Sequence, residues 1–459
     1  MINLLLAKSD FYTFILSKNY DKNSIAKKSI QCNWRIPMSQ ISITKGLNLP
    51  FTEGADESIS IEKFSKIISI DLSPYTYLDL KLTKAVGDFI EKGEVIVKDV
   101  HLEDRVFLSH TTGKIVEVIR GERRKITSIL IEKGASSEKT FPQIEMNLSK
   151  EGMMEEIFKR GASFFINKRP LERVINKGDY PSAIFIHTVT SAPYTPSFRY
   201  IMDGNEEIFA YGISILKKFG EVDLIYNDNF FSNQKGCRCH KAIGPHPIES
   251  SSLHISALHP ISSFNTVIWS INVYDVLSIG SIMGKGSVFS KKVIALAGSG
   301  FSEKDRILIK TDMGSCIEEI APKGAHVVAG NPLTGKLHEK YLRRKDYTIT
   351  SLQLNEVREI LPFIKPSFMR SKSLQYKLGG EKRPFILKDI YQKHFPFHIY
   401  IEPLIKAILA KDFDLAISLG FLEIEKEDLC LAEYMCPSKI SLMAIYEEGK
   451  KNYLELQEK

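Results

Sequence analysis

The sequence lacks any apolar run long enough to cross a membrane. A spanning helix requires about 20 consecutive apolar residues, whereas Lys8, Asp10, Lys18 and similar side chains near the C-terminus interrupt every candidate stretch. The first seven residues contain no Lys or Arg, so the basic segment that opens a secretory signal peptide is also missing. We therefore expect a soluble chain that is not secreted and stays in the cytoplasm.

Cysteine is scarce, with six residues scattered over 459 positions. That number does not form a disulfide framework and indicates a reducing compartment. The densest group of soft ligands is 237–240 together with His246, but one residue between two cysteines seldom lets both thiolates reach one tetrahedral zinc ion. Cys430 and Cys436 lack the C-x-x-C-x-x-C run that precedes the last ligand of a ferredoxin-type cluster. We predict neither a metal site nor an iron–sulfur cluster in this chain.

Positive charge is modest, because the net charge is +7 and the two basic runs, 120–125 and 341–345, are short. A nucleic-acid-binding surface carries a denser patch, so we expect no nucleic-acid partner. We interpret both runs as solvated surface, with contact to an anionic membrane as the alternative.

The first 37 residues show no clean periodicity, whereas a regular pattern begins at Met38. Residues 1–37 are therefore either not native, with Met38 as the true start, or an amphipathic extension that packs on a partner. With 43% hydrophobic and 25% charged residues the remainder has the composition of a folded protein, and its length exceeds a single core. We predict an α/β (α+β) multidomain chain.

Short alternating strands with glycine turns dominate 38–135, most clearly in 86–96 and 109–118. This pattern resembles the flattened barrel of biotinyl and lipoyl carrier domains. A carrier presents its modified lysine at a hairpin tip beside Met or a similar residue, and Lys98, in the hairpin 97–105, lacks that context. We predict a structural barrel without biotin or lipoate.

Residues 150–288 change to a Rossmann-like α/β pattern with a parallel sheet. We expect helices at 151–160 and 205–218 and buried strands at 183–186 and 222–226. No G-x-G-x-x-G follows Ile186, so a nucleotide bound in the usual Rossmann manner is disfavoured.

Residues 289–345 predict a small β-grasp (SLBB-like) module. A strand at 293–297 enters a G-x-G, but Glu303 takes the place of the third glycine; a helix near 316–320 and a strand at 326–329 follow. Residues 346–459 predict a linker strand and a helical C-terminal domain, with helices beginning near Glu402-Pro403 and covering about 438–456. The first of these helices has an apolar face formed by Ile399, Leu404, Ile405, Ile408 and Leu409.

The segment Gly330–Leu337 matches the G-x-x-x-x-G-K of a phosphate-binding P-loop and follows a predicted strand. Leu337 stands where the P-loop needs a Ser or Thr hydroxyl for magnesium, and Pro332 removes one amide that would cradle phosphate. We interpret the segment as a plain turn and keep a P-loop nucleotide-binding enzyme as an alternative.

A series of short motifs resembles the family of the A subunits of sodium-translocating NADH:quinone oxidoreductases (Na+-NQR), in the family's order. The opening K-G-L-x-L-P lies in Ile43–Pro50, and the others are Arg169-Pro170, Gly244–Pro247, Trp269–Asn272, Leu296–Gly298, Leu333–Gly335, and Leu429 through Cys436–Lys439. One departure is Ile248-Glu249, where the family typically has Ala-Gly, and this leaves the local backbone shape open.

The resemblance implies a cofactor-free, peripheral subunit on the cytoplasmic face of the bacterial inner membrane. It implies integral and flavin-carrying partner subunits, with NADH, flavins and iron–sulfur centres held by those partners. The assembled translocase would oxidise NADH, reduce ubiquinone and export sodium, and no catalysis is expected from the isolated chain. A purely structural scaffold within the same complex is the alternative.

A quinone site needs donors for two carbonyl oxygens in an apolar slot. His246, stiffened by Pro245 and Pro247 after Gly244, is the first candidate donor because its imidazole can also supply a proton. Further candidates are the donors Arg169 and Tyr274 and the apolar wall Trp269. The alternative for His246 is a structural role.

Overall fold

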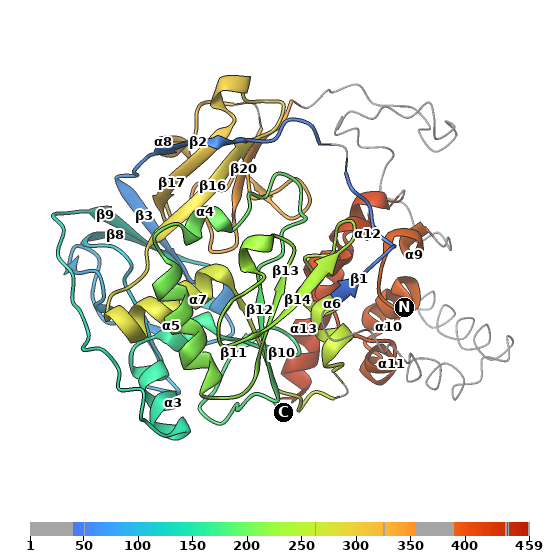
Figure 1. Ribbon diagram of the computed structural model, residues 1–459, viewed down its shortest axis with the longest axis horizontal. Coiled ribbons are helices and arrows are strands. Elements are labelled where there is room, and N and C mark those ends of the chain that lie inside the picture. The colour runs from blue at the N-terminus through green and yellow to red at the C-terminus, as the bar shows by residue number, and fades with distance from the viewer. Residues whose placement is uncertain are drawn as a thin grey trace, which may run out of the picture.

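The computed structural model describes residues 40–49, 51–261, 263–324, 326–353, 390–436, 438 and 440–457. The expectations for residues 1–37 and for Met38 fall outside these ranges. The described residues form a barrel, a seven-stranded α/β domain, a six-stranded sheet and a group of C-terminal helices (Figure 1).

The barrel is built from two small antiparallel sheets, as the alternating pattern predicts. One has the order β3-β9-β8-β5 and the other β4-β6-β7. Their bounds are β3 Ile67–Asp71, β4 Leu80–Leu82, β5 Phe89–Ile90, β6 Val95–Asp99, β7 Val106–Leu108, β8 Gly113–Arg120 and β9 Ile126–Lys133. Lys98 lies inside β6, paired with Lys81 and Val106, so it does not occupy a hairpin tip.

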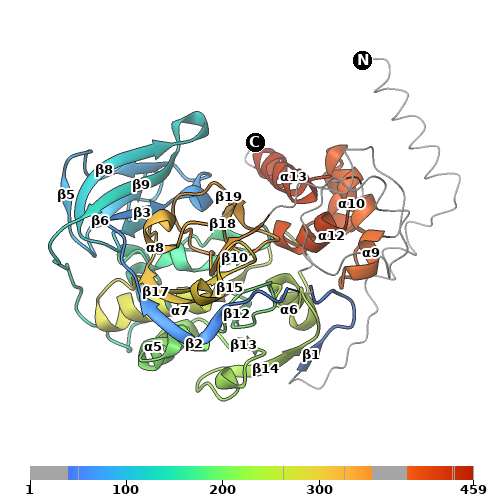
Figure 2. The ribbon, with the colours of Figure 1, turned by 90° about the horizontal axis from the view of Figure 1, so that it is seen from above.

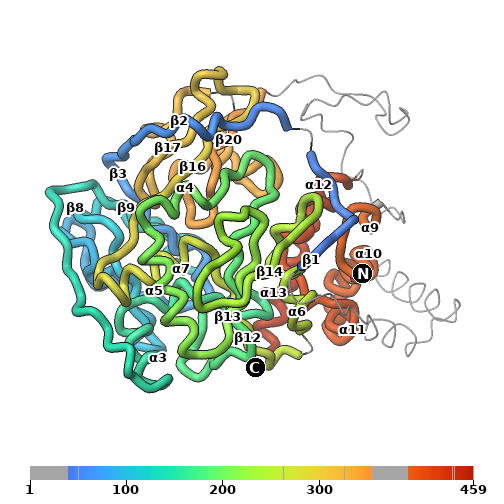
Figure 3. The backbone as a smooth tube through the Cα atoms, in the orientation of Figure 1, coloured from blue at the N-terminus to red at the C-terminus, as the bar shows by residue number. Residues whose placement is uncertain are grey.

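Residues 40–62 differ from the prediction, which assigned them to the barrel. The strand β1 (Gln40–Ser42) pairs in parallel with β14 of the α/β domain. The strand β2 (Asp56–Glu62) pairs in parallel with β17 of the six-stranded sheet. Figure 3 shows this segment crossing the molecule from β1 through β2 to β3. The periodicity of such short strands indicates extended backbone but not the sheet that they join.

The α/β domain has the strand order β1-β14-β13-β12-β15-β10-β11. Strands β12 (Ala183–His187), β13 (Val222–Tyr226), β14 (Arg238–Ile243) and β15 (Ile268–Asn272) are parallel, while β10 (Asn167–Arg169) runs antiparallel to β15 and to β11 (Arg173–Val174). The predicted strands and the parallel sheet are therefore present. The helices α3 (Lys150–Lys159) and α5 (Glu206–Lys217) confirm the two predicted helices within one residue.

Successive side chains of β12 point alternately into two cores, one on each face of the α/β sheet. Ile184 and Ile186 belong to the core that α5 and α7 (Val273–Gly280) cover. Phe185 belongs to the second core, which α6 (Ser251–Leu258) and the C-terminal helices cover. Both faces of this parallel sheet are thus buried, which explains why its strands are nearly continuous apolar runs.

The six-stranded sheet has the order β19-β18-β20-β16-β17-β2. It contains β16 (Lys291–Ala297), β17 (Ile307–Asp312), β18 (Val327–Ala329), β19 (Lys336–Leu337) and β20 (Thr348–Ser351), with the short helix α8 (Ile317–Ile320). The predicted linker strand is β20, which lies between β18 and β16 and so belongs to this sheet. Residues 330–337 lead into β19, not into the helix that a P-loop opens, which agrees with a plain turn.

The basic run 341–345 is not a solvated face, contrary to our interpretation. Arg344 donates to the Tyr75 hydroxyl and the Phe164 carbonyl and forms an ion pair with Asp275, so it joins the barrel to the α/β domain. Arg343 pairs with Asp346 at 2.7 Å. The buried Asp275 carboxylate requires a cation nearby, which explains the inward direction of Arg344.

The C-terminal helices lie together at one side of the α/β sheet (Figure 2). They are α9 (Ile390–His394), α10 (Ile401–Leu409), α11 (Phe413–Ser418), α12 (Cys430–Met435) and α13 (Leu442–Gln457). The apolar face of α10 is buried as predicted except for Leu409, which is 54% exposed at the end of the helix. Among the described residues, no helix is long and apolar enough to span a membrane.

Candidate functional site

The loop 244–247 interlocks with the segment 43–49 at the end of β14. Gly46 has φ +142°, and a Cβ atom there would lie 2.3 Å from the His246 carbonyl oxygen. Leu47 donates its amide to that same oxygen at 2.8 Å. Gly244 has φ +152°, and a Cβ atom there would lie 2.7 Å from the Ile43 carbonyl oxygen. The structure therefore requires glycine at both positions, and the two motifs form one structural unit.

His246 is buried in this unit, with 4% of its surface exposed. Its Nδ1 lies 3.1 Å from the Ser191 hydroxyl, and its Nε2 lies 4.0 Å from the Cys430 sulfur. Burial lowers the pKa of His246, so the imidazole is neutral at pH 7 and has one donor and one acceptor. Pro245 and Pro247 fix the loop further, because their carbonyls accept from the amides of residues 248 and 250. The peptide bond before Pro247 is cis.

The departure at Ile248-Glu249 has a clear structural role. One Glu249 carboxylate oxygen accepts from the amides of Ser191 and Ala192 at 2.6 and 2.7 Å. These amides follow β12, at the carboxyl edge of the sheet where a dinucleotide-binding fold places its phosphates. An internal carboxylate occupies them here.

A buried chain of histidines lies beside this loop, and the sequence analysis did not identify it. His254 Nε2 donates to the Ile248 carbonyl at 2.8 Å, so in a neutral ring Nδ1 is the acceptor. His187 Nδ1 lies 2.9 Å from that acceptor and must donate to it, which leaves His187 Nε2 to accept from the Ser270 hydroxyl. Burial lowers the pKa of His254 to about 4 and that of His187 well below its usual value. Both rings are therefore neutral.

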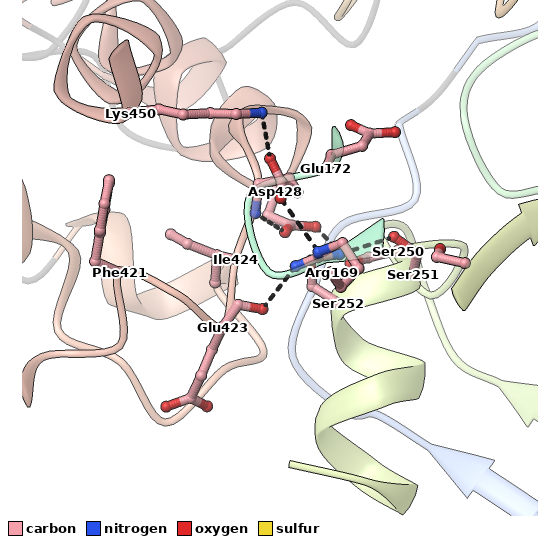
Figure 4. A network of polar contacts seen from close by, with 12 residues as sticks. Arg169, Glu172, Ser250, Ser251, Ser252, Phe421, Glu423, Ile424, Asp428 and Lys450 are labelled. Carbon is pink, nitrogen blue, oxygen red and sulfur yellow. Dashed lines mark hydrogen bonds and ion pairs between the residues drawn. The ribbon is translucent and has the colours of Figure 1, made fainter. Parts of the chain in front are cut away.

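Arg169 forms the centre of a second polar cluster, at the seam between the α/β domain and the C-terminal helices (Figure 4). Its guanidinium donates to the Ser251 and Ser252 hydroxyls at 3.3 and 3.1 Å and to the Glu423 carbonyl at 3.2 Å. Arg169 Nε lies 3.1 Å from a Glu425 carboxylate oxygen. The Nε–H does not point at that oxygen, so this contact is an ion pair without a hydrogen bond.

The carboxylates of this seam are costly to bury. Burial raises the pKa of Glu425 even though Lys450 and Arg169 lie beside it. Burial likewise raises the pKa of Asp428, whose carboxylate accepts from the Ser250 hydroxyl. Partners from other elements oppose this shift and stabilise the charged form of each carboxylate.

Two predicted site residues, Trp269 and Tyr274, lie on the other face of the sheet. Both belong to the core that α5 and α7 cover. The Trp269 indole donates to the Asp179 carbonyl at 3.0 Å, and the Tyr274 hydroxyl bonds to the backbone of Val293. The structure therefore brings His246 and Arg169 together against residues 423–430 and leaves Trp269 and Tyr274 apart from them.

The soft-ligand side chains of 237–240 and His246 do not point to one common centre. Cys237 and Cys239 lie with their sulfur atoms 3.9 Å apart, but His240 points to Asp223 at 2.8 Å. His246 contacts Ser191 instead. Within the part of the chain that the structure describes, no three His, Cys, Asp or Glu side chains are grouped to hold a metal ion.

Comparison with known proteins identifies the family of this chain. Residues 41–134 match the model of the NqrA N-terminal barrel-sandwich hybrid domain, and residues 148–288 match that of the NqrA second alpha/beta domain. Among curated relatives, the A subunit of the Na(+)-translocating NADH-quinone reductase from Chlamydia caviae is 30% identical over 90% of this chain and 97% of its own length. The protein of the same name from Photorhabdus laumondii is 28% identical over 87% of this chain and 96% of its own length. The chain therefore belongs to the NqrA family, the A subunits of Na(+)-translocating NADH-quinone reductases.

Proposed function

We propose that this chain is the peripheral subunit of a sodium-translocating NADH:ubiquinone reductase and contributes to the quinone end of that complex. The observation that carries the proposal is the similarity to A subunits of Na(+)-translocating NADH-quinone reductases over nearly their full length. In this proposal NADH, the flavins and any iron–sulfur centre belong to partner subunits, and this chain holds none of them.

The proposed attachment is a protein interface with an integral membrane protein of the complex at the cytoplasmic face of the inner membrane. Lipid contact through basic residues supplies about 1 kcal/mol per well-placed Lys or Arg, screened within about 8 Å at physiological salt. The inward direction of Arg344 removes one such residue from the surface. An obligate protein interface commonly exceeds about 2,000 Å² and survives high salt.

Washing native membranes in high salt tests this attachment. The proposal expects the chain to remain bound after the wash and to be released as a folded protein when the gene of the integral partner is deleted. Release by salt alone, with the partner present, would show that electrostatic attraction to lipid dominates.

For the quinone, His246 is the proposed donor, because a neutral imidazole can donate a hydrogen bond to a quinone carbonyl and later transfer a proton. The variant His246→Gln tests this assignment. Its ubiquinone KM, kcat and inhibitor sensitivity are measured in the assembled complex. His101→Gln is the matched control, because His101 lies in the barrel with 74% of its side chain exposed. Unchanged kinetics in His246→Gln would remove this assignment.

A scaffold role is the second candidate, and a specific observation favours it. His246 and Arg169 both bind residues of other elements across the domain seam, as structural residues do. The two candidates differ in a binding assay: a quinone-binding subunit binds ubiquinone saturably and stoichiometrically, and a scaffold does not.

A further inference from the structure

Cys237 and Cys239 form a close pair of thiols that the proposed function leaves unused. Cys237 directly precedes β14, and Cys239 lies within it. The residue between them, Arg238, points to Asp223 at 2.7 Å, and His240 does the same. The two cysteines instead pack against the core beneath α5. Alternation along the strand therefore places both thiols on one face, with their sulfur atoms 3.9 Å apart.

The surroundings of the pair distinguish its two sulfur atoms. Both thiols contact the Gln234 carbonyl, at 3.3 Å from Cys237 and 3.9 Å from Cys239. The hydrogen bond between the thiols lowers the pKa of Cys239 and raises that of Cys237. The Cys237 thiol lies closer to the Gln234 carbonyl and is the better placed of the two to keep its proton and donate it there. Because the thiolate is the nucleophilic form of cysteine, Cys239 is then the attacking sulfur. Both residues are half-buried, which leaves access for a small reagent.

We propose that Cys237 and Cys239 are a modification site, a thiol pair that a peroxide oxidises to an intrachain disulfide. The Cys239 thiolate attacks one peroxide oxygen and breaks the O–O bond, which yields a sulfenic acid and releases hydroxide. The Cys237 thiol then attacks the sulfenic sulfur, forms the S–S bond and releases water. The two electrons pass from the sulfur atoms to hydrogen peroxide. The pair must close from 3.9 Å to about 2.05 Å. Strand residues two positions apart have Cα atoms about 6.7 Å apart, near the upper limit for a disulfide, so the closure requires a backbone shift at Cys237, which lies just before β14.

The sequence itself provides a sharp assay. Trypsin cleaves after Lys235, Arg238 and Lys241, so it separates the two cysteines into the peptides 236–238 and 239–241. The full chain is purified reduced, treated with hydrogen peroxide, alkylated with iodoacetamide and digested. We expect the two peptides to appear joined, with the loss of two hydrogen atoms from their summed mass, and to separate on treatment with dithiothreitol.

Three variants test the assignment. Cys316→Ser removes another partly buried cysteine and should keep the linked peptides. Cys237→Ser should abolish the link and leave Cys239 as a sulfenic acid that dimedone traps, whereas Cys239→Ser should trap far less at Cys237. Separate alkylation of both peptides after peroxide, or their linkage to other cysteines, would overturn the proposal. Stronger dimedone labelling of Cys237 than of Cys239 would overturn the assignment of the attacking sulfur. This inference does not depend on the proposed function.

Discussion

Replacing Arg169 with Met should loosen the C-terminal helices from the α/β domain. Arg169 is 1% exposed and contacts Ser251, Ser252, Glu423 and Glu425 at 3.1 to 3.3 Å. Met fills much of the volume but, among the described residues, leaves Lys450 at 3.4 Å as the one cation paired with the Glu425 carboxylate. Removal of one partner from a buried ion pair costs about 3–5 kcal/mol. We expect a loss of that size in the free energy of opening of α12 and α13.

Amide hydrogen exchange of α12 and α13 measures this free energy without assuming that a multidomain chain unfolds in two states. Arg123→Met is the matched control, because Arg123 is 76% exposed and forms with Glu455 of α13 an exposed ion pair at 3.8 Å, a kind of pair worth about 0–1 kcal/mol, so exchange should change little.

The double variant Arg169→Met with Glu425→Met gives a second, more specific result. Burial already raises the pKa of Glu425 in spite of its partners, so removing this carboxylate relieves a desolvation cost. The double variant should therefore be more stable than Arg169→Met alone. A change below about 1 kcal/mol in Arg169→Met, or no recovery in the double variant, would refute the account of the seam.

Three further predictions concern the loop around His246, all measured by hydrogen exchange. Gly46→Ala, which forces a Cβ against the His246 carbonyl at φ +142°, should cost about 1–3 kcal/mol or more, whereas Gly54→Ala, with no atom within 4 Å, should change exchange little; equal effects would contradict the interlock. Because the folded-state pKa of His254 lies near 4, below its unfolded value of 6.5, stability is present above pH 6.5 and falls toward pH 4 by about 1.36 kcal/mol per pH unit from this group. His254→Gln should reduce the dependence of stability on pH between 4 and 6.5. The same dependence in the variant and the unmodified chain would contradict a neutral buried ring. Glu249→Ala should raise hydrogen exchange at the amides of Ser191 and Ala192, whereas Glu249→Gln, which keeps an acceptor, should raise it less. Equal exchange rates in the two variants would show that the carboxylate does not hold these amides.

The sequence predicted the elements whose signal is long and local. Strand β12, helix α5 and strand β13 have buried runs or full helical periodicity, and each was predicted within one or two residues. The strands β1 and β2 were assigned to the wrong sheet, because three to seven alternating residues do not specify which edge they pair with.

The site was only partly predictable, for a related reason. His246 and Arg169 could be singled out from their motifs, but their partners come from distant segments: Arg169 and Glu423 are separated by 254 positions. The histidines of the buried chain stand alone in the sequence, without a spacing that indicates a pair. The one available signal was the position of His187 at the end of the buried strand β12. The inward direction of Arg344 depends on Asp275 in another domain, so a basic run by itself resembled solvated surface.

The central claim is membership in a working membrane complex, and affinity purification of the tagged chain from its native membranes tests it most directly. The account predicts that the chain is recovered with membrane-spanning and flavin-carrying subunits, and that the purified assembly shows sodium-stimulated NADH:ubiquinone reductase activity. Recovery of the chain alone from intact membranes, or of an assembly without flavin and without that activity, would contradict it.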